Sequence, residues 1–168
     1  MTGPAPRLTH VDERGRAHMV DVTGKEVTRR VAEARCVVRT AADVATVLAR
    51  GQGGHALVGM ARLAGVQAAK LTPTLVPLCH PLLIDTTEVE VVPVAGGIAV
   101  RAVATVTERT GVEMEALTAC AVAGLVLVQA LLDDDPGASV EDLTLWRKSG
   151  GRSGDWVRRP DGEPPPGS

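Results

Sequence analysis

Residues 110–132 read T-G-V-E-M-E-A-L-T-A-C-A-V-A-G-L-V-L-V-Q-A-L-L and form the longest helical pattern in the sequence. Thr110 and Glu113 have the T-x-x-E spacing of a capping box, which predicts the start of a helix. The pattern is apolar on every side between Glu115 and Gln129. We therefore expect a helix buried against a sheet, a second subunit or both. Its length and its small and polar interruptions argue against a membrane span.

Two carboxylates mark the first turn of this helix, where the helix dipole favours negative charge. Glu113 and Glu115 are therefore either part of the helix cap or part of a site, and the pattern leaves both interpretations open. The run D-D-D-P-G at residues 133–137 is expected to end the helix.

The composition favours one cytoplasmic domain with an aliphatic core. The 168 residues include no Phe or Tyr and only two Trp, so Val, Leu and Ala must fill the core. The net charge of −2 offers no field that attracts nucleic acid. The three cysteines are widely spaced and form no C-x-x-C, which indicates a reducing compartment and argues against disulfides and zinc. No signal peptide is recognised, and no metal or cofactor is expected.

The first half of the chain predicts a strand followed by two helices. We expect residues 1–7 to be disordered, residues 8–25 to form a loop or edge strand, and residues 28–39 to form a strand. His10 and His18 are interpreted as surface or hydrogen-bonding residues. Residues 41–50 and 57–70 have helical periodicity, separated by G-Q-G-G at 51–54, which is interpreted as a loop. Thr72-Pro73 is expected to end the second helix.

The segment L-V-P-L-C-H-P-L at residues 75–82 holds a Cys-His pair between two prolines. The prolines predict a rigid, extended loop. A histidine fixed there can contact a phosphate or transfer a proton, but it can equally be a half-buried residue bonded to the backbone.

The second half predicts a hairpin, the long helix and a final strand. Residues 86–94 and 98–106 alternate around A-G-G, and residues 143–148 form a short strand. The following S-G-G-R-S-G at 149–154 is either a mobile loop or, with Lys148 and Arg152, an anion site. Helices on one face of an antiparallel sheet, an α+β fold, fit this order. One domain is expected over residues 8–157, with a disordered tail at 158–168.

Five of these motifs together resemble the cyclic pyranopterin monophosphate synthase (MoaC) family of molybdenum cofactor biosynthesis. They are L-T-H-x-D-E-x-G-x-A-x-M-V-D-V, M-A-R-L-A-G-V-Q-A-A-K, L-x-P-L-C-H-P-L, T-G-V-E-M-E-A-L-T-A and K-S-G-G-R-S-G, in the family's order. The resemblance implies a ferredoxin-like fold, dimers with an active site at their interface, and a hexamer built from three dimers. It also implies a lyase that rearranges 3′,8-cyclo-7,8-dihydroguanosine triphosphate, the product of a radical-SAM partner, to cyclic pyranopterin monophosphate and pyrophosphate.

The resemblance also implies a set of site residues. Lys148 corresponds to an active-site lysine, and Arg152 stands at the position of a further family lysine. The remaining residues correspond to substrate-binding positions: Leu78, Cys79, His80, Glu113, Met114, Glu115, Lys25 and Arg30.

Several catalytic positions differ from the family pattern. The family's catalytic Asp and Lys on the long helix correspond to Gln129 and Leu132, and a third lysine falls near Gly54. Arg109 also replaces a lysine, and an arginine clamps phosphate but rarely releases a proton. The sequence therefore predicts that the phosphate-binding half of the site is kept and that the proton-transfer half is lost.

Two functions remain open at this point. One is a working synthase in which Lys148, Lys70 or a residue of another subunit replaces the missing groups. The other is an impaired or repurposed member that binds a nucleotide or pterin-like ligand, or that assembles with an active paralogue. Either function predicts a small-molecule ligand and no nucleic-acid or membrane partner.

Overall fold

The computed structural model describes residues 8–49, 52–152 and 154–159. The predicted disordered residues 1–7 and most of the predicted tail lie outside these ranges. The elements in chain order are β1 (Thr28–Arg39), α1 (Val44–Ala49), α2 (Gln52–Leu75), β2 (Thr86–Val94), β3 (Gly97–Glu108), α3 (Glu113–Leu131), β4 (Ser139–Ser149) and β5 (Trp156–Val157).

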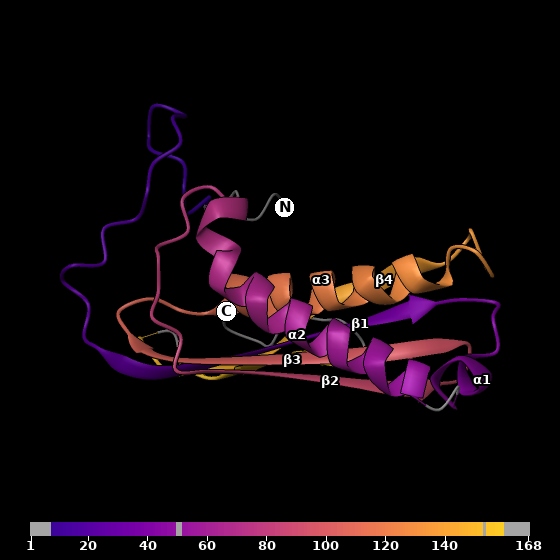
Figure 1. Ribbon diagram of the computed structural model, residues 1–168. Coiled ribbons are helices and arrows are strands. Elements are labelled where there is room, and N and C mark those ends of the chain that lie inside the picture. Colours follow the sequence, from indigo (N-terminus) through magenta and orange to yellow (C-terminus); the bar gives the residue numbers. More distant parts are fainter. Residues whose placement is uncertain (1–7, 50–51, 153, 160–168) are drawn as a thin grey trace.

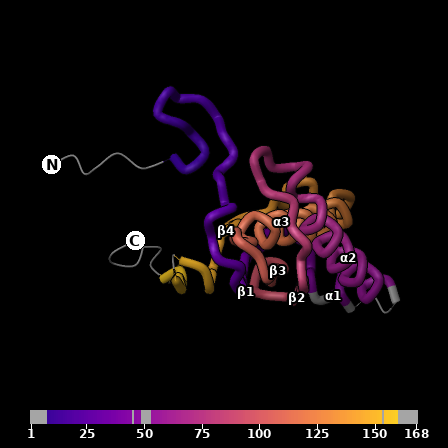
Figure 2. Tube along the Cα trace, turned by 90° about the vertical axis from the view of Figure 1, so that its left-hand side faces the viewer, coloured from indigo at the N-terminus to yellow at the C-terminus, as the bar shows by residue number. Residues whose placement is uncertain are grey.

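The strands form one antiparallel sheet in the order β2-β3-β1-β4-β5. Helices α2 and α3 lie along one face of this sheet, and the other face carries no helix (Figure 1). Residues 8–27 leave the sheet at the start of β1 and project away from it as an arm (Figures 1 and 2). The predicted α+β fold, a ferredoxin-like antiparallel sheet with helices on one face, is confirmed.

The core lies between the sheet and α3, and it is aliphatic as the composition predicts. Alternate residues of a strand point to the same side, and in β1 the fully buried residues Ala32, Ala34 and Val38 face the helices. Small side chains on α3 meet them, so the helix lies close to the strands. The buried residues of α3 are Glu115, Ala116, Ala119, Cys120, Ala123, Gly124, Leu127 and Leu131.

Glycines bring α2 and β4 close to α3. A Cβ added to Gly65 of α2 would lie 2.9 Å from the carbonyl oxygen of Ala119, and one added to Gly124 would lie 3.1 Å from Val140 of β4. Both distances are shorter than ordinary van der Waals contact, so a larger residue at either position would push these elements apart.

Helix α3 is buried along one side and exposed along another. Among the described residues, α3 is the one helix whose length and apolar composition would be enough to cross a membrane. Its packing against the sheet makes it the central core helix of this fold. Leu125 remains 58% exposed and Leu132 45% exposed, so a strip of apolar surface faces outward.

The structure corrects the predicted start of α3. The helix begins at Glu113 with Val112 as its N-cap, and no side chain caps it. The capping box predicted from Thr110 and Glu113 is therefore wrong. The reason is where the helix starts: Val112 at the N-cap has no side-chain acceptor, and Glu113 stands at the first helical position, where its carboxylate accepts a hydrogen bond from the Lys148 ammonium at 3.2 Å.

The bounds of α2 are also wider than the sequence predicts. The helix includes Gly53 and Gly54, which were interpreted as a loop, and it continues past Pro73 to Leu75. A proline removes one N–H donor, but the Val76 N–H still donates to the Thr72 carbonyl at 2.9 Å. The helical path therefore resumes after the proline.

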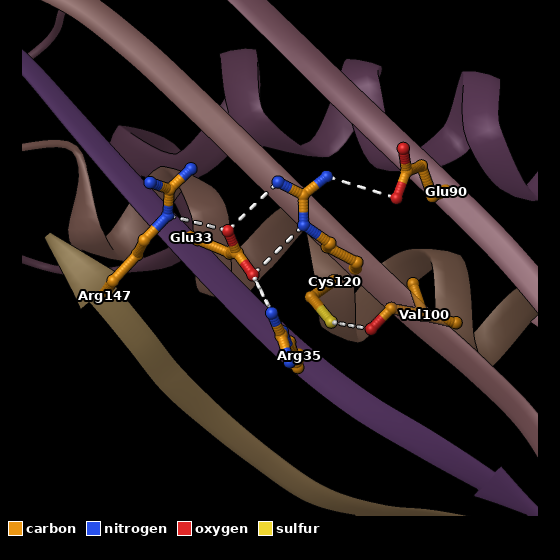
Figure 3. A network of polar contacts seen from close by, with 7 residues as sticks. Glu33, Arg35, Glu90, Val100, Cys120 and Arg147 are labelled. Carbon is orange, nitrogen blue, oxygen red and sulfur yellow. Dashed lines mark hydrogen bonds and ion pairs between the residues drawn. The ribbon is translucent and has the colours of Figure 1, made fainter. Parts of the chain in front are cut away.

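The face of the sheet without helices is organised around one buried carboxylate (Figure 3). Glu33 of β1 is 2% exposed and accepts hydrogen bonds from Arg35, Arg101 and Arg147 at 2.7 to 3.0 Å. Burial alone would raise the pKa of Glu33, but the three guanidinium groups outweigh it and lower the pKa to about 2. The guanidinium of Arg35 also stacks 4.1 Å from the ring centroid of Trp146.

Candidate active site

The Cys-His segment and the start of α3 enclose a cavity of about 260 Å³, which we call the ring cavity. Two segments that are distant in the sequence supply its walls, residues 78–82 after α2 and residues 110–115 at the start of α3. Its lining consists of His10, Leu78, Cys79, His80, Leu82, Thr110, Gly111, Glu113, Met114 and Glu115. All six residues predicted to bind substrate in these two segments are therefore brought together.

A strained turn places the Cys-His pair in this cavity. The Cys79 N–H donates to the Val76 carbonyl at 3.3 Å, so Pro77 and Leu78 occupy the middle of a turn. Leu78 has a φ of 66°, a left-handed conformation that costs a leucine energy. This turn corrects the prediction of a fully extended loop. Strain of this kind concentrates at functional sites, where the surrounding structure holds it in place.

Glu115 lies on the buried side of the ring cavity. It is 3% exposed, and burial, together with the nearby charge of Glu113, raises its pKa to about 7. Burial and the charge of Glu115 also raise the pKa of the neighbouring Cys79 thiol. Near neutral pH, the Glu115 carboxyl can therefore hold or release a proton, whereas Cys79 remains a thiol.

A second cavity of about 360 Å³, the cation cavity, lies at the start of β1. Its three cationic side chains come from separate segments, Lys25 before β1, Arg30 within it and Arg152 after β4. The rest of the lining consists of Gly24, Glu26, Thr28 and Gly151. Three positive charges against one carboxylate make this cavity suited to an anion.

Glycines shape the loop that carries Arg152. Gly150 and Gly151 have φ values of 87° and 73°, which side chains disfavour. A Cβ on Gly151 would collide with the Arg30 guanidinium. The Nε of Arg30 donates to the Glu108 carbonyl at 3.0 Å, which fixes that guanidinium against the loop.

The Glu113–Lys148 pair connects the two cavities. A small intervening cavity is lined by residues of both, including Arg30, Gly111, Glu113, Lys148 and Gly150. The Lys148 side chain is 34% exposed and that of Glu113 is 31% exposed, so solvent and ligands reach both. The shared lining residues place the three cavities next to one another, in a row from the Cys-His segment to the basic residues that we call the path.

Gln129 and Leu132 lie at the opposite end of α3 from this path. Both side chains are exposed, and neither lines the three cavities described above. The acidic run after the helix folds back on the scaffold. Asp135 accepts hydrogen bonds from the Thr40 hydroxyl at 2.8 Å and the Ala41 N–H at 2.7 Å. The hydrogen bond from Ala41 is the main cause of the lowered pKa of Asp135.

The substituted positions Gly54 and Arg109 and the replacement candidate Lys70 do not line the ring cavity either. Gly54 lies in the first turns of α2, and Lys70 lies in the same helix. Arg109 directly follows β3. Lys148 alone among the named replacement candidates joins the path between the cavities.

Among the cavity residues that sequence reasoning did not assign to a site are His10 and Thr28. His10, interpreted as a surface or hydrogen-bonding residue, donates from Nδ1 to the His18 carbonyl at 3.4 Å and also lines the ring cavity. Its place in the L-T-H motif was the available signal. Thr28 lines the cation cavity, and its position two residues before Arg30 puts both on the same side of β1.

The chain is similar in sequence to proteins of one family. The MoaC family model matches residues 19–151. A cyclic pyranopterin monophosphate synthase of Nocardioides sp. is 49% identical over 164 residues, covering 94% of this chain and 99% of the relative. A synthase of the same name from Streptomyces coelicolor is 47% identical over 158 residues, covering 92% of each chain. Cyclic pyranopterin monophosphate synthase 2 of Mycobacterium tuberculosis is 48% identical over 154 residues, covering 90% of this chain and 92% of the relative.

Proposed function

The chain belongs to the MoaC family, and we propose that it acts in molybdenum cofactor biosynthesis as a cyclic pyranopterin monophosphate synthase. The reaction converts 3′,8-cyclo-7,8-dihydroguanosine triphosphate to cyclic pyranopterin monophosphate and pyrophosphate. A radical-SAM enzyme upstream would supply the substrate, in the cytoplasm. The observation that carries the proposal is the row of adjacent cavities from the ring cavity to the cation cavity, which share Glu113 and Arg30 as lining residues.

The two cavities suit the two halves of this substrate. The ring cavity combines apolar side chains, such as Leu82 and Met114, with polar side chains that can pair with the hydrogen-bonding edge of a heterocycle. The cation cavity supplies Lys25, Arg30 and Arg152 for the triphosphate. Cations at this position stabilise the negative charge that develops as pyrophosphate leaves.

The proton transfers of the rearrangement are assigned to groups along the path. Glu115, whose pKa is raised to about 7, is the candidate general acid and base at the ring cavity. His80 lines the same cavity and offers a second group for proton transfer. Lys148, paired with Glu113 at 3.2 Å, is placed between the rings and the phosphates and can donate a proton or a hydrogen bond there.

This assignment addresses the altered positions on α3. Gln129 cannot act as a carboxylate base and Leu132 carries no proton, so a working site must draw its acid and base from elsewhere. The buried Glu115 and the accessible Lys148 meet that requirement within one chain. An impaired or repurposed protein remains the outcome to exclude by experiment.

We further propose that the working unit is a hexamer formed by three dimers, with each site at a dimer interface. Exposed apolar side chains on both helices support an interface over the helical layer. They include Met60 (56% exposed), Leu63 (70%) and Leu75 (57%) on α2, and Leu125 (58%) on α3. The Gln129 and Leu132 end of a neighbouring α3 would then form a neutral wall of the site. Light scattering that finds only monomer at micromolar concentration contradicts this.

The test of the proposed function is turnover by the purified protein. Given the cyclised triphosphate, the protein should release pyrophosphate and form cyclic pyranopterin monophosphate in equal amounts. Arg30→Ala, which removes a cation of the phosphate half and leaves the ring cavity intact, is the matched control and should raise KM. No product at enzyme concentrations equal to substrate would refute the synthase function and favour a repurposed protein.

A further inference from the structure

The cation cavity contains a polar group that the fold does not satisfy. The Oγ1 of Thr28 is buried and has no hydrogen-bond partner among the residues that the structure describes. Burying a hydroxyl without a partner costs stability, and such groups are few in native proteins. Because Thr28 lines the cation cavity, a ligand in that cavity is the natural partner for this hydroxyl.

The surroundings of Thr28 define the chemistry of that ligand. Thr28 and Arg30 stand on the same side of β1, since alternate residues of a strand share a face. Lys25 and Arg152 complete the positive lining, with Glu26 as the one acidic side chain in it. The Arg30 guanidinium is held by the Glu108 carbonyl and by its contact with Gly151, so it is already in place before a ligand enters.

We propose that Thr28 is a phosphate-binding residue whose hydroxyl donates a hydrogen bond to an oxygen of the substrate's pyrophosphate portion. This inference rests on the proposed function, because the substrate it deepens is the triphosphate. The cations attract the anion through charge, and this attraction depends little on the orientation of the anion. A hydroxyl on a strand that is fixed by pairing with β3 adds a directional contact, because Thr28 lies opposite Glu108 in the sheet.

Removing the unpaired Thr28 hydroxyl should have opposite effects on the stability of the protein and on its binding of pyrophosphate. Thr28→Val replaces the hydroxyl by a methyl group of nearly the same size and suits a strand equally well. Removing an unsatisfied buried hydroxyl should leave the melting temperature unchanged or raise it. The same change should weaken pyrophosphate binding by roughly tenfold, since a hydrogen bond to a charged oxygen is lost.

The experiment measures pyrophosphate binding to the full-length protein by calorimetry, together with the melting temperature without ligand. Thr28→Ser retains the hydroxyl and should bind pyrophosphate within about twofold of the wild type. Thr107→Val is the matched control on β3, because the Thr107 hydroxyl has a partner and donates to Asp85 at 2.8 Å. It should lower the melting temperature and leave pyrophosphate affinity unchanged.

Three results would overturn the inference. They are absence of pyrophosphate binding by the wild type at millimolar concentration, wild-type affinity in Thr28→Val, and weakened binding that comes with a lowered melting temperature. The last result would give Thr28 a structural role. If Thr28→Val weakens binding as expected but the wild type does not release pyrophosphate from the cyclised triphosphate, the phosphate-binding role of Thr28 stands and the proposed function falls with the substrate assigned to it.

Discussion

The Lys148 ammonium lies 3.2 Å from the Glu113 carboxylate, and this ion pair stands where the ring cavity meets the path to the cation cavity. The contact joins Lys148, near the end of β4, to Glu113, the first residue of α3. It ties the start of α3, where the N-cap residue Val112 has no side-chain acceptor, to the sheet.

Replacing Lys148 should distinguish the effect of its positive charge from the effect of its ability to donate a proton. Lys148→Arg keeps the positive charge beside Glu113 but rarely releases a proton. We expect pyrophosphate affinity close to that of the wild type and a kcat reduced by roughly 100-fold or more. Steady-state kinetics of both Lys148→Arg and Lys148→Ala provide the measurement. Full kcat in Lys148→Arg would limit Lys148 to an electrostatic role.

Glu115 should make the stability of the protein fall as pH rises. Its pKa is raised from 4.5 to about 7 in the folded state, so the folded protein binds this proton more tightly than the unfolded chain. The resulting stabilisation is fully present below pH 4.5 and is lost as pH rises to about 7. It amounts to about 3 kcal/mol.

Glu115→Gln tests this account because glutamine is neutral at every pH. Urea unfolding between pH 4.5 and 8 should show a flatter dependence on pH than in the wild type, with kcat reduced by roughly 100-fold. Glu88→Gln, at an exposed position on β2, is the control. An unaltered pH dependence in Glu115→Gln would remove Glu115 as the titrating group.

Glu33 should have the opposite effect on stability, because the protein should lose stability as pH falls into the acidic range. Three guanidinium groups lower its pKa to about 2, so its contribution to stability is present above pH 4.5 and is lost as pH falls towards 2. Glu33→Gln leaves Arg35, Arg101 and Arg147 without their shared carboxylate. We expect a loss of about 2–3 kcal/mol in the free energy of unfolding. Glu90→Gln, which removes an exposed partner of Arg101, should cost less than about 1 kcal/mol.

The sequence predicts the scaffold well because the scaffold depends on local patterns. The alternation in residues 28–39 marks β1 at its observed bounds, and the A-G-G turn between the two hairpin strands fixes β2 beside β3. These signals need no knowledge of distant residues.

The predictions that fail depend on contacts between distant segments. The capping box fails because the helix starts only at Glu113, whose side chain pairs with Lys148, 35 residues away. Helix α2 packs closely on α3 at Gly65 and is longer than its glycines and Pro73 favour. The buried hydroxyl of Thr28 and the cavity position of His10 appear only once the chain is folded.

Restoring the family's pattern on α3 should test whether proton transfer limits the reaction. Gln129→Asp and Leu132→Lys lie one helical turn apart and exposed, so the double variant should fold without strain. If only the proton-transfer groups are lacking, turnover should rise by orders of magnitude. The single variants are the controls. Unchanged turnover in a folded double variant that still binds ligand would show that its pocket differs in other ways.

The central claim is that one substrate spans both cavities, and paired affinities test it most directly. Affinities for pyrophosphate and for the cyclised triphosphate are to be measured by calorimetry in the Glu115→Gln background, where turnover is slow. Arg30→Ala should weaken both ligands by roughly tenfold, whereas His80→Ala should weaken only the cyclised triphosphate. Unchanged affinity of His80→Ala for the cyclised triphosphate would contradict the claim, because the ring cavity would then take no part in binding it.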